Sequence, residues 1–318
     1  MKLFRPETFQ GNLNKKKYFE GWYFKHVSPG GEHVFSFIPG VSLTKKDQHA
    51  FIQFINGVSG QTDYIRYPLS DFDFTPGKLE IRIGESRFSL EGIELNIRSS
   101  DFTAIGTIDY SDVVKYPSGF FSPGIMGWYS FVPFMECKHG IGSVLHRLKG
   151  SMKLNGESFD FPGGTGYIEK DWGTSFPESW IWLHCNTFDE PDCSFTFSVA
   201  KIPWLGSFFI GHICFLYLKG KFYTFATYNR SEITRIDFSG KTLELEIKNR
   251  SYLLKVRAVQ KQTSHLQAPD TGVMDRMIKE SIDSEMKLTL TDLKGEVRFE
   301  GIGSHAGMEV IEKILSYF

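Results

Sequence analysis

The sequence predicts an all-β protein whose antiparallel strands form sandwiches or barrels. Short segments of alternating apolar and polar residues recur along the chain, turn residues separate them, and aromatic residues make up 15% of the 318 residues. Aromatic side chains favour strands. Regularly spaced strands without helical stretches between them are typical of sandwiches and barrels.

The predicted strands are the alternating segments, which cover residues 20–26, 33–38, 51–55, 79–83, 87–90, 180–188, 195–200, 208–218, 243–247, 252–258 and 286–290. Turn signals such as Asn56-Gly57 and Asn155-Gly156 lie between them. Residues 308–318 carry apolar side chains at helical spacing, which predicts a short C-terminal helix. A second short helix is expected over residues 273–282.

The length is sufficient for two domains, each with its own core. We expect the first to cover residues 1–165 and the second residues 166–318. Within the first, residues 112–140 combine prolines and glycines with phenylalanine, tryptophan and tyrosine. This composition predicts an irregular flap over a pocket, and a packed loop is the alternative.

The composition argues against several classes of function. The net charge of −1 leaves no basic excess to neutralise a phosphate backbone, so no nucleic-acid partner is expected. The N-terminal residues lack the apolar run of a signal peptide, and no stretch approaches the roughly 20 apolar residues that span a bilayer. We therefore expect a cytoplasmic protein that is not integral to a membrane, with transient membrane contact left open.

Cysteine and histidine spacing gives no sign of a metal or cofactor site. The four cysteines lack CxxC spacing, and the nine histidines form no HxH or HExxH pattern. A serine-nucleophile elbow and a dinucleotide fingerprint are also missing. The sequence therefore predicts free thiols, no metal and no cofactor, and it does not indicate an oligomeric state.

One predicted strand has the composition of a pocket wall. Trp180, Trp182, His184 and Asn186 alternate along it and therefore share one face, while the intervening residues form an apolar core face. Two large aromatics with two hydrogen-bonding groups are typical of a small-molecule site. The alternative is a strand whose tryptophans cover an interface.

Near the N-terminus, Glu20 shares a strand face with Tyr18, Trp22 and Phe24. A carboxylate among aromatics is costly to bury alone. Either Glu20 is protonated, or it pairs with a lysine or arginine and joins two strands, or this face is exposed.

Three strings carry a resemblance to a known family. They are Glu-Gly-Trp-Tyr-Phe-Lys at residues 20–25, Tyr-Ile-Glu-Lys-Asp-Trp-Gly at 167–173 and Trp-Ile-Trp-Leu-His-Cys-Asn at 180–186. Together they resemble the tocopherol cyclase family.

The resemblance implies two lipocalin-like antiparallel β-barrel domains, related in architecture to carotenoid hydratases. It also implies cofactor-free closure of a chromanol ring on a prenylated quinol. The sequence departs from the plant members at Asp171 and His184, so the resemblance gives neither a shared catalytic role.

Ring closure of this kind needs a proton donor for the alkene and a wall that tolerates positive charge. Glu169 is the first candidate donor because it lies in the central string, and Glu20 is the second. The alternative for Glu169 is an ion pair with Lys170 or an arginine. His184 or Asn186 could orient a hydroxyl group. The candidate substrate-binding aromatics are Trp22, Trp172, Trp180 and Trp182.

Two other functions remain open from sequence. The first is a carrier that binds an isoprenoid or another apolar ligand without turnover, since each buried methylene contributes about 0.8 kcal/mol. The second is a related hydratase or isomerase.

Overall fold

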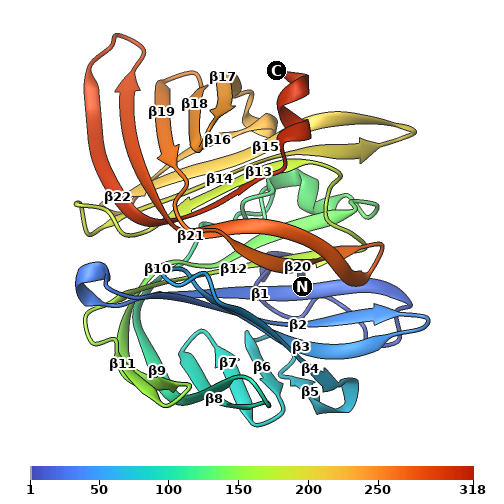
Figure 1. The fold of residues 1–318 in the computed structure, drawn as a ribbon. Coiled ribbons are helices and arrows are strands. Elements are labelled where there is room, and N and C mark those ends of the chain that lie inside the picture. The colour runs from blue at the N-terminus through green and yellow to red at the C-terminus, as the bar shows by residue number, and fades with distance from the viewer. Residues whose placement is uncertain (1) are drawn as a thin grey trace. The chain divides into compact units, whose positions relative to one another are not determined.

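The computed structural model describes residues 2–318, and nearly all of its regular structure is β-strand (Figure 1). The strands form two antiparallel sheets of 12 and 10 strands. Both sheets are of the lipocalin-like barrel type, and the first is nearly closed. The predicted all-β fold class is confirmed.

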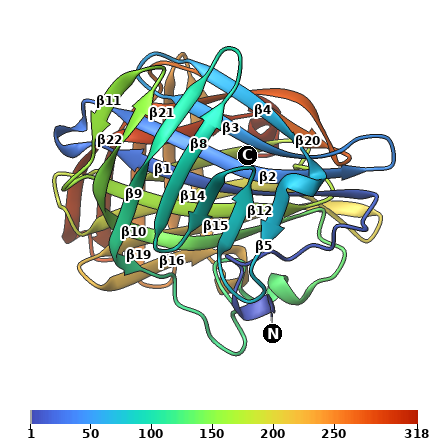
Figure 2. The ribbon, with the colours of Figure 1, turned by 90° about the horizontal axis from the view of Figure 1, so that it is seen from below.

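The first sheet has the strand order β4-β3-β2-β1-β12-β10-β9-β8-β7-β6-β5, with β11 added to β10 (Figure 2). Its strands are β1 (Lys17–Val27), β2 (Val34–Thr44), β3 (Gln48–Asn56), β4 (Thr62–Pro68), β5 (Phe72–Phe74), β6 (Glu80–Ile83), β7 (Ser86–Ser89), β8 (Gly92–Arg98), β9 (Thr103–Val114), β10 (Cys137–Leu154), β11 (Glu157–Asp160) and β12 (Thr165–Gly173).

The second sheet has the order β16-β15-β14-β13-β22-β21-β19-β18-β17, with β20 added to β21. Its strands are β13 (Trp180–Cys185), β14 (Cys193–Trp204), β15 (Ser207–Leu218), β16 (Lys221–Ala226), β17 (Glu232–Ser239), β18 (Thr242–Lys248), β19 (Tyr252–Val259), β20 (Ser264–Asp270), β21 (Val273–Asp292) and β22 (Val297–Val310).

Helical structure in residues 2–318 consists of short 3₁₀ turns: η1 (Lys2–Phe4), η2 (Pro29–Gly31), η3 (Leu69–Asp71), η4 (Gly127–Phe131), η5 (Thr227–Asn229) and η6 (Glu312–Tyr317). The expected C-terminal helix is present as η6, but it begins only after β22 ends at Val310. The helix expected over residues 273–282 is wrong, because this segment is the first half of β21. This segment has too few apolar residues to distinguish the periodicity of a helix from that of a strand.

Contacts within the chain define two compact units. The first comprises the residues up to Asn56, then Gly60–Phe176 and His265–Ile278, and the second comprises Gly57–Ser59, Pro177–Ser264 and Lys279–Phe318. The expected boundary after residue 165 falls at the start of β12, a strand of the first sheet.

The segment 265–278 joins the first unit through side-chain contacts to β3. The Gln53 amide donates to the Gln267 carbonyl at 2.9 Å and accepts from the Gln267 amide at 3.0 Å. A buried amide that completes two backbone hydrogen bonds fixes this segment to β3.

Each unit has its own core, built from the inward residues of its strands. Trp22 and Phe24 of β1 belong to the first core, and Ile181, Leu183 and Cys185 of β13 belong to the second. The alternation predicted for these two strands is therefore confirmed. All four cysteines are free thiols.

The irregular segment lies between β9 and β10 and is shorter than the expected 112–140. It spans residues 115–136, with η4 and one isolated bridge between Gly119 and Ser122 as its regular features.

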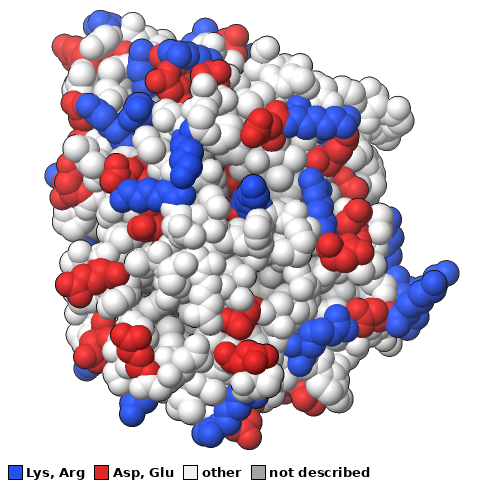
Figure 3. All heavy atoms as spheres, in the orientation of Figure 1, with Lys and Arg blue, Asp and Glu red and all other residues white. Residues whose placement is uncertain are grey.

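Charge on the surface is mixed. On the face that Figure 3 shows, lysine and arginine are interspersed with aspartate and glutamate. No helix among residues 2–318 has the length and apolar character needed to cross a membrane.

Candidate active site

Strand β12 presents different chemistry on its two faces. Antiparallel pairing sets His139 of β10 opposite Asp171, and Ile141 opposite Glu169. Because opposite residues in a sheet point to the same side, these four side chains share one face. Lys170 and Trp172 alternate with them and lie on the other face.

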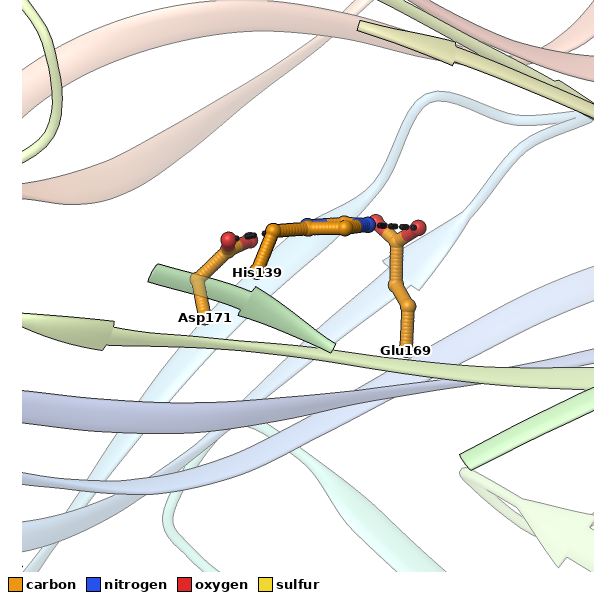
Figure 4. A group of neighbouring side chains, drawn as sticks. All are labelled: His139, Glu169 and Asp171. Carbon is orange, nitrogen blue, oxygen red and sulfur yellow. Dashed lines mark hydrogen bonds and ion pairs between the residues drawn. The ribbon is translucent and has the colours of Figure 1, made fainter. Parts of the chain in front are cut away.

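On the first face, His139 lies between two carboxylates (Figure 4). Its Nδ1 is 2.9 Å from Oδ1 of Asp171, and its Nε2 is 3.5 Å from Oε2 of Glu169. The hydroxyl of Tyr167 donates to the same Glu169 oxygen at 2.6 Å. Glu169 is 5% exposed and Tyr167 is fully buried, so this hydrogen-bonded group is largely shielded from water.

The two carboxylates determine the protonation of His139. Burial alone would lower the pKa of His139, but the negative charges of Asp171 and Glu169 outweigh burial and raise the pKa to about 9. This shift favours the imidazolium at neutral pH, in which both ring nitrogens are donors, Nδ1 toward Asp171 and Nε2 toward Glu169.

The same three residues are the candidate metal ligands among residues 2–318, since one ligand atom from each lies within 4.8 Å of the others. However, each ring nitrogen of His139 faces a different carboxylate. A metal ion would have to displace the proton and one of these contacts. As the side chains lie, each ring nitrogen of His139 is positioned for a hydrogen bond or ion pair with a carboxylate.

The other face of β12 carries a buried ion pair. Lys170 Nζ lies 2.5 Å from Oε1 of Glu20, and both side chains are fully buried. Burial lowers the pKa of Lys170 to about 8, while the attraction of Glu20 opposes this shift. The pair joins β1 to β12, which is the structural alternative that the sequence left open for Glu20.

Glu20 has a full set of hydrogen-bond donors. The amides of Gln10 and Gly11 donate to its two oxygens at 2.8 and 2.9 Å, and the Tyr18 hydroxyl donates as well. Lys170 also donates to the carbonyl of Thr8. These hydrogen bonds hold the N-terminal segment against the ion pair of Glu20 and Lys170.

Two of the predicted substrate-binding tryptophans surround Lys170. Its Nζ lies 4.9 Å from the ring centre of Trp22 and 4.5 Å from that of Trp172. Trp22 also donates from its indole nitrogen to the Glu7 carbonyl at 2.7 Å. Both rings pack against the first core, so the structure does not bring them to the face of Glu169.

The other predicted wall residues lie in the second unit, on the face of β13 opposite its core. Trp180, Trp182, His184 and Asn186 are all buried. Trp180 donates to Oε2 of Glu309 at 2.6 Å. The rings of Trp182 and His184 stack with centres 6.2 Å apart, and Nδ1 of His184 lies 3.0 Å from the Phe195 carbonyl. Their predicted role in binding stays a prediction.

Sequence reasoning missed His139 altogether. It lies 30 residues before Glu169, and only the pairing of β10 with β12 brings it there. Asp171 shares the face of Glu169 because both lie on β12, a strand that is not among the predicted ones.

Comparison with known proteins identifies the family of the chain. The sequence profile described as Tocopherol cyclase-like matches residues 101–311, which include His139, Glu169 and Asp171. The chain belongs to the tocopherol cyclase-like family.

Among curated family relatives, the chloroplastic tocopherol cyclase of Zea mays is 25% identical over 198 residues. A rice protein (Oryza sativa subsp. japonica) named for the same activity is 25% identical over 196 residues. Each match covers 58% of this tocopherol cyclase-like chain and 41% of the plant protein.

Solved structures support the fold of this family member. The crystal structure of CghA has a TM-score of 0.57 at 10% identity and covers 92% of this chain and 88% of its own. A crystal structure from Nitrosomonas europaea that carries the name AttH has a TM-score of 0.52 at 14% identity, with 94% of each chain covered. At these identities the likeness extends to the fold alone.

Proposed function

We propose that this protein catalyses a cofactor-free, acid-promoted ring closure of a prenylated quinol or related isoprenoid. The observation that carries the proposal is the position of His139 between Glu169 and Asp171, with one ring nitrogen facing each carboxylate. Family membership and the names of the plant relatives support the choice of reaction class.

In the proposed reaction, His139 passes its proton from Nε2 to Glu169, and Glu169 delivers it to the alkene of the substrate. A carbon–hydrogen bond forms as the π bond breaks, which leaves a tertiary carbocation. The phenol oxygen then attacks this carbon and transfers its proton to Glu169, and Glu169 passes that proton to Nε2 of His139, which restores the starting charges. Nothing is oxidised or reduced, and substrate and product have the same mass.

The surroundings of Glu169 suit this role. Tyr167 holds the reacting oxygen in place, which supplies the positioning that a weak acid requires. Asp171 binds the far nitrogen of His139 and keeps the ring aimed at Glu169. Because the pKa of His139 is raised to about 9, the proton is available throughout the neutral range.

The test is incubation of the protein with prenylated hydroquinones in heavy water, followed by mass spectrometry. The proposal expects a product with one solvent deuterium in the former prenyl tail. Glu169→Gln should lower the rate by at least about 100-fold while substrate still binds. Glu157→Gln, at an exposed position on β11 of the same sheet, is the matched control and should leave the rate unchanged.

Tight binding of such quinols without turnover, in wild type and variant alike, would replace this proposal with the carrier. Full activity of Glu169→Gln would remove Glu169 as the donor.

A further inference from the structure

The segment 115–136 of the first unit exposes an unusual number of aromatic side chains. Phe120 is 74% exposed and Phe121 is 80% exposed, and Trp128 and Phe131 are each about half exposed. Aromatic residues at this density are normally buried, and a cluster of exposed ones marks an interaction surface.

The two phenylalanines are presented on a closed turn. The backbone amides of Gly119 and Ser122 each donate to the other's carbonyl, at 2.9 and 3.0 Å. The rings of Phe120 and Phe121 contact each other edge to face, with centres 5.0 Å apart. In Figure 2 the segment that follows β9 loops out at the lower edge of the view, near the N-terminus. The turn therefore holds two apolar rings in water, and burial of these rings against a partner would be favourable.

Three cations and two acids line a cavity at the base of this tip. Arg5, Lys78 and Lys115 line a cavity of about 360 Å³ together with Tyr116 and Ser118 of the same segment. All three cationic side chains are exposed. The acids that line the cavity are Glu7 and Glu91, so the cavity lining carries a net positive charge.

We propose that the aromatic tip, Phe120 and Phe121, is a membrane-contact site that enters the surface of an anionic bilayer. Phenylalanine rings enter the boundary between headgroups and acyl chains, while Arg5, Lys78 and Lys115 meet the anionic headgroups. Interfacial elements combine apolar and basic groups in this way. The inference does not depend on the proposed reaction.

Sedimentation of the full-length protein with lipid vesicles tests the site. The vesicles contain phosphatidylglycerol and phosphatidylcholine in equal parts, and pure phosphatidylcholine vesicles serve for comparison. Wild type should bind the anionic vesicles, and binding should weaken as salt is raised. Phe120→Ser combined with Phe121→Ser should weaken this binding by about tenfold or more.

A matched control separates the tip from general surface hydrophobicity. Ile302 of β22 is 63% exposed, and Ile302→Ser should leave vesicle binding unchanged. Phe120, Phe121 and Ile302 are all on the surface, so the circular dichroism and melting curves of the variants should match those of wild type.

Three outcomes overturn the proposal. One is wild-type binding to anionic vesicles no stronger than to phosphatidylcholine. Another is a double variant that still binds like wild type. The third is self-association in solution that the double variant abolishes, which would assign the tip to a second copy of this chain.

Discussion

Glu169 and Lys170 are neighbours in β12, yet their side chains lie on opposite faces of the sheet and have separate partners. Glu169 contacts His139 and Tyr167, whereas Lys170 pairs with Glu20 inside the first unit. The sequence left open an ion pair between Glu169 and Lys170, and this alternative is therefore wrong. One strand therefore carries both the proposed acid, Glu169, and the cation of a buried ion pair.

Breaking the buried ion pair should be costly. Glu20→Gln or Lys170→Met should each lower the free energy of unfolding by about 3–5 kcal/mol, because the remaining charge is buried without its partner. Urea denaturation measures this loss. The double variant should be more stable than either single one, since it leaves no lone charge.

The exposed pair of Lys287 and Glu300, whose side chains are about half exposed, provides the comparison. Lys287→Met should change stability by less than about 1 kcal/mol. An equal loss at both pairs would contradict the assignment of Lys170 to a buried, satisfied pair.

His139 should make stability depend on pH. Its folded pKa, raised to about 9, exceeds the ordinary value of 6.5. The stabilisation is therefore complete below pH 6.5 and is lost as pH rises through 9, by about 3 kcal/mol in total. Urea denaturation across this range measures the loss. His139→Gln should be less stable at neutral pH, and its stability should lack this alkaline decline.

The same proton should govern turnover. We expect the rate of ring closure to fall as pH rises through 9, because His139 then has no proton to pass to Glu169. A pH–rate profile of the wild type measures this. An activity that persists unchanged above pH 10 would show that the proton comes from elsewhere.

Tyr167 should act by positioning. Tyr167→Phe removes the hydroxyl that donates to Oε2 of Glu169, and we expect about a tenfold loss of kcat with little change in KM. A purely structural role predicts loss of folded protein instead, which thermal melting would reveal.

Part of this arrangement was predictable from sequence. Alternation along β1 and β13 correctly grouped Glu20 with Trp22 and separated Trp182 from Ile181, because side chains in a strand alternate regardless of context. The pairing of strands distant in the chain depends on register and closure. Sequence therefore could not reveal that His139 reaches Glu169, or that Gln53 holds the segment at Gln267.

Gly307 should prove intolerant of a side chain. A Cβ atom there would lie 2.4 Å from the indole ring of Trp182. Gly307→Ala should lower the free energy of unfolding by about 1–3 kcal/mol and change the tryptophan fluorescence. Gly119, which has open space around it, is the control, and Gly119→Ala should have little effect on either measurement.

The ion pair between Glu20 and Lys170 also has a consequence for how the chain folds during synthesis. Lys170 is made 150 positions after its partner, so Glu20 stays without its counter-charge until most of the first unit has left the ribosome. The backbone amides of Gln10 and Gly11, only 10 and 9 residues from Glu20, are partners that the chain can offer it before then. The full set of partners around Glu20 therefore becomes available only once Lys170 has been made.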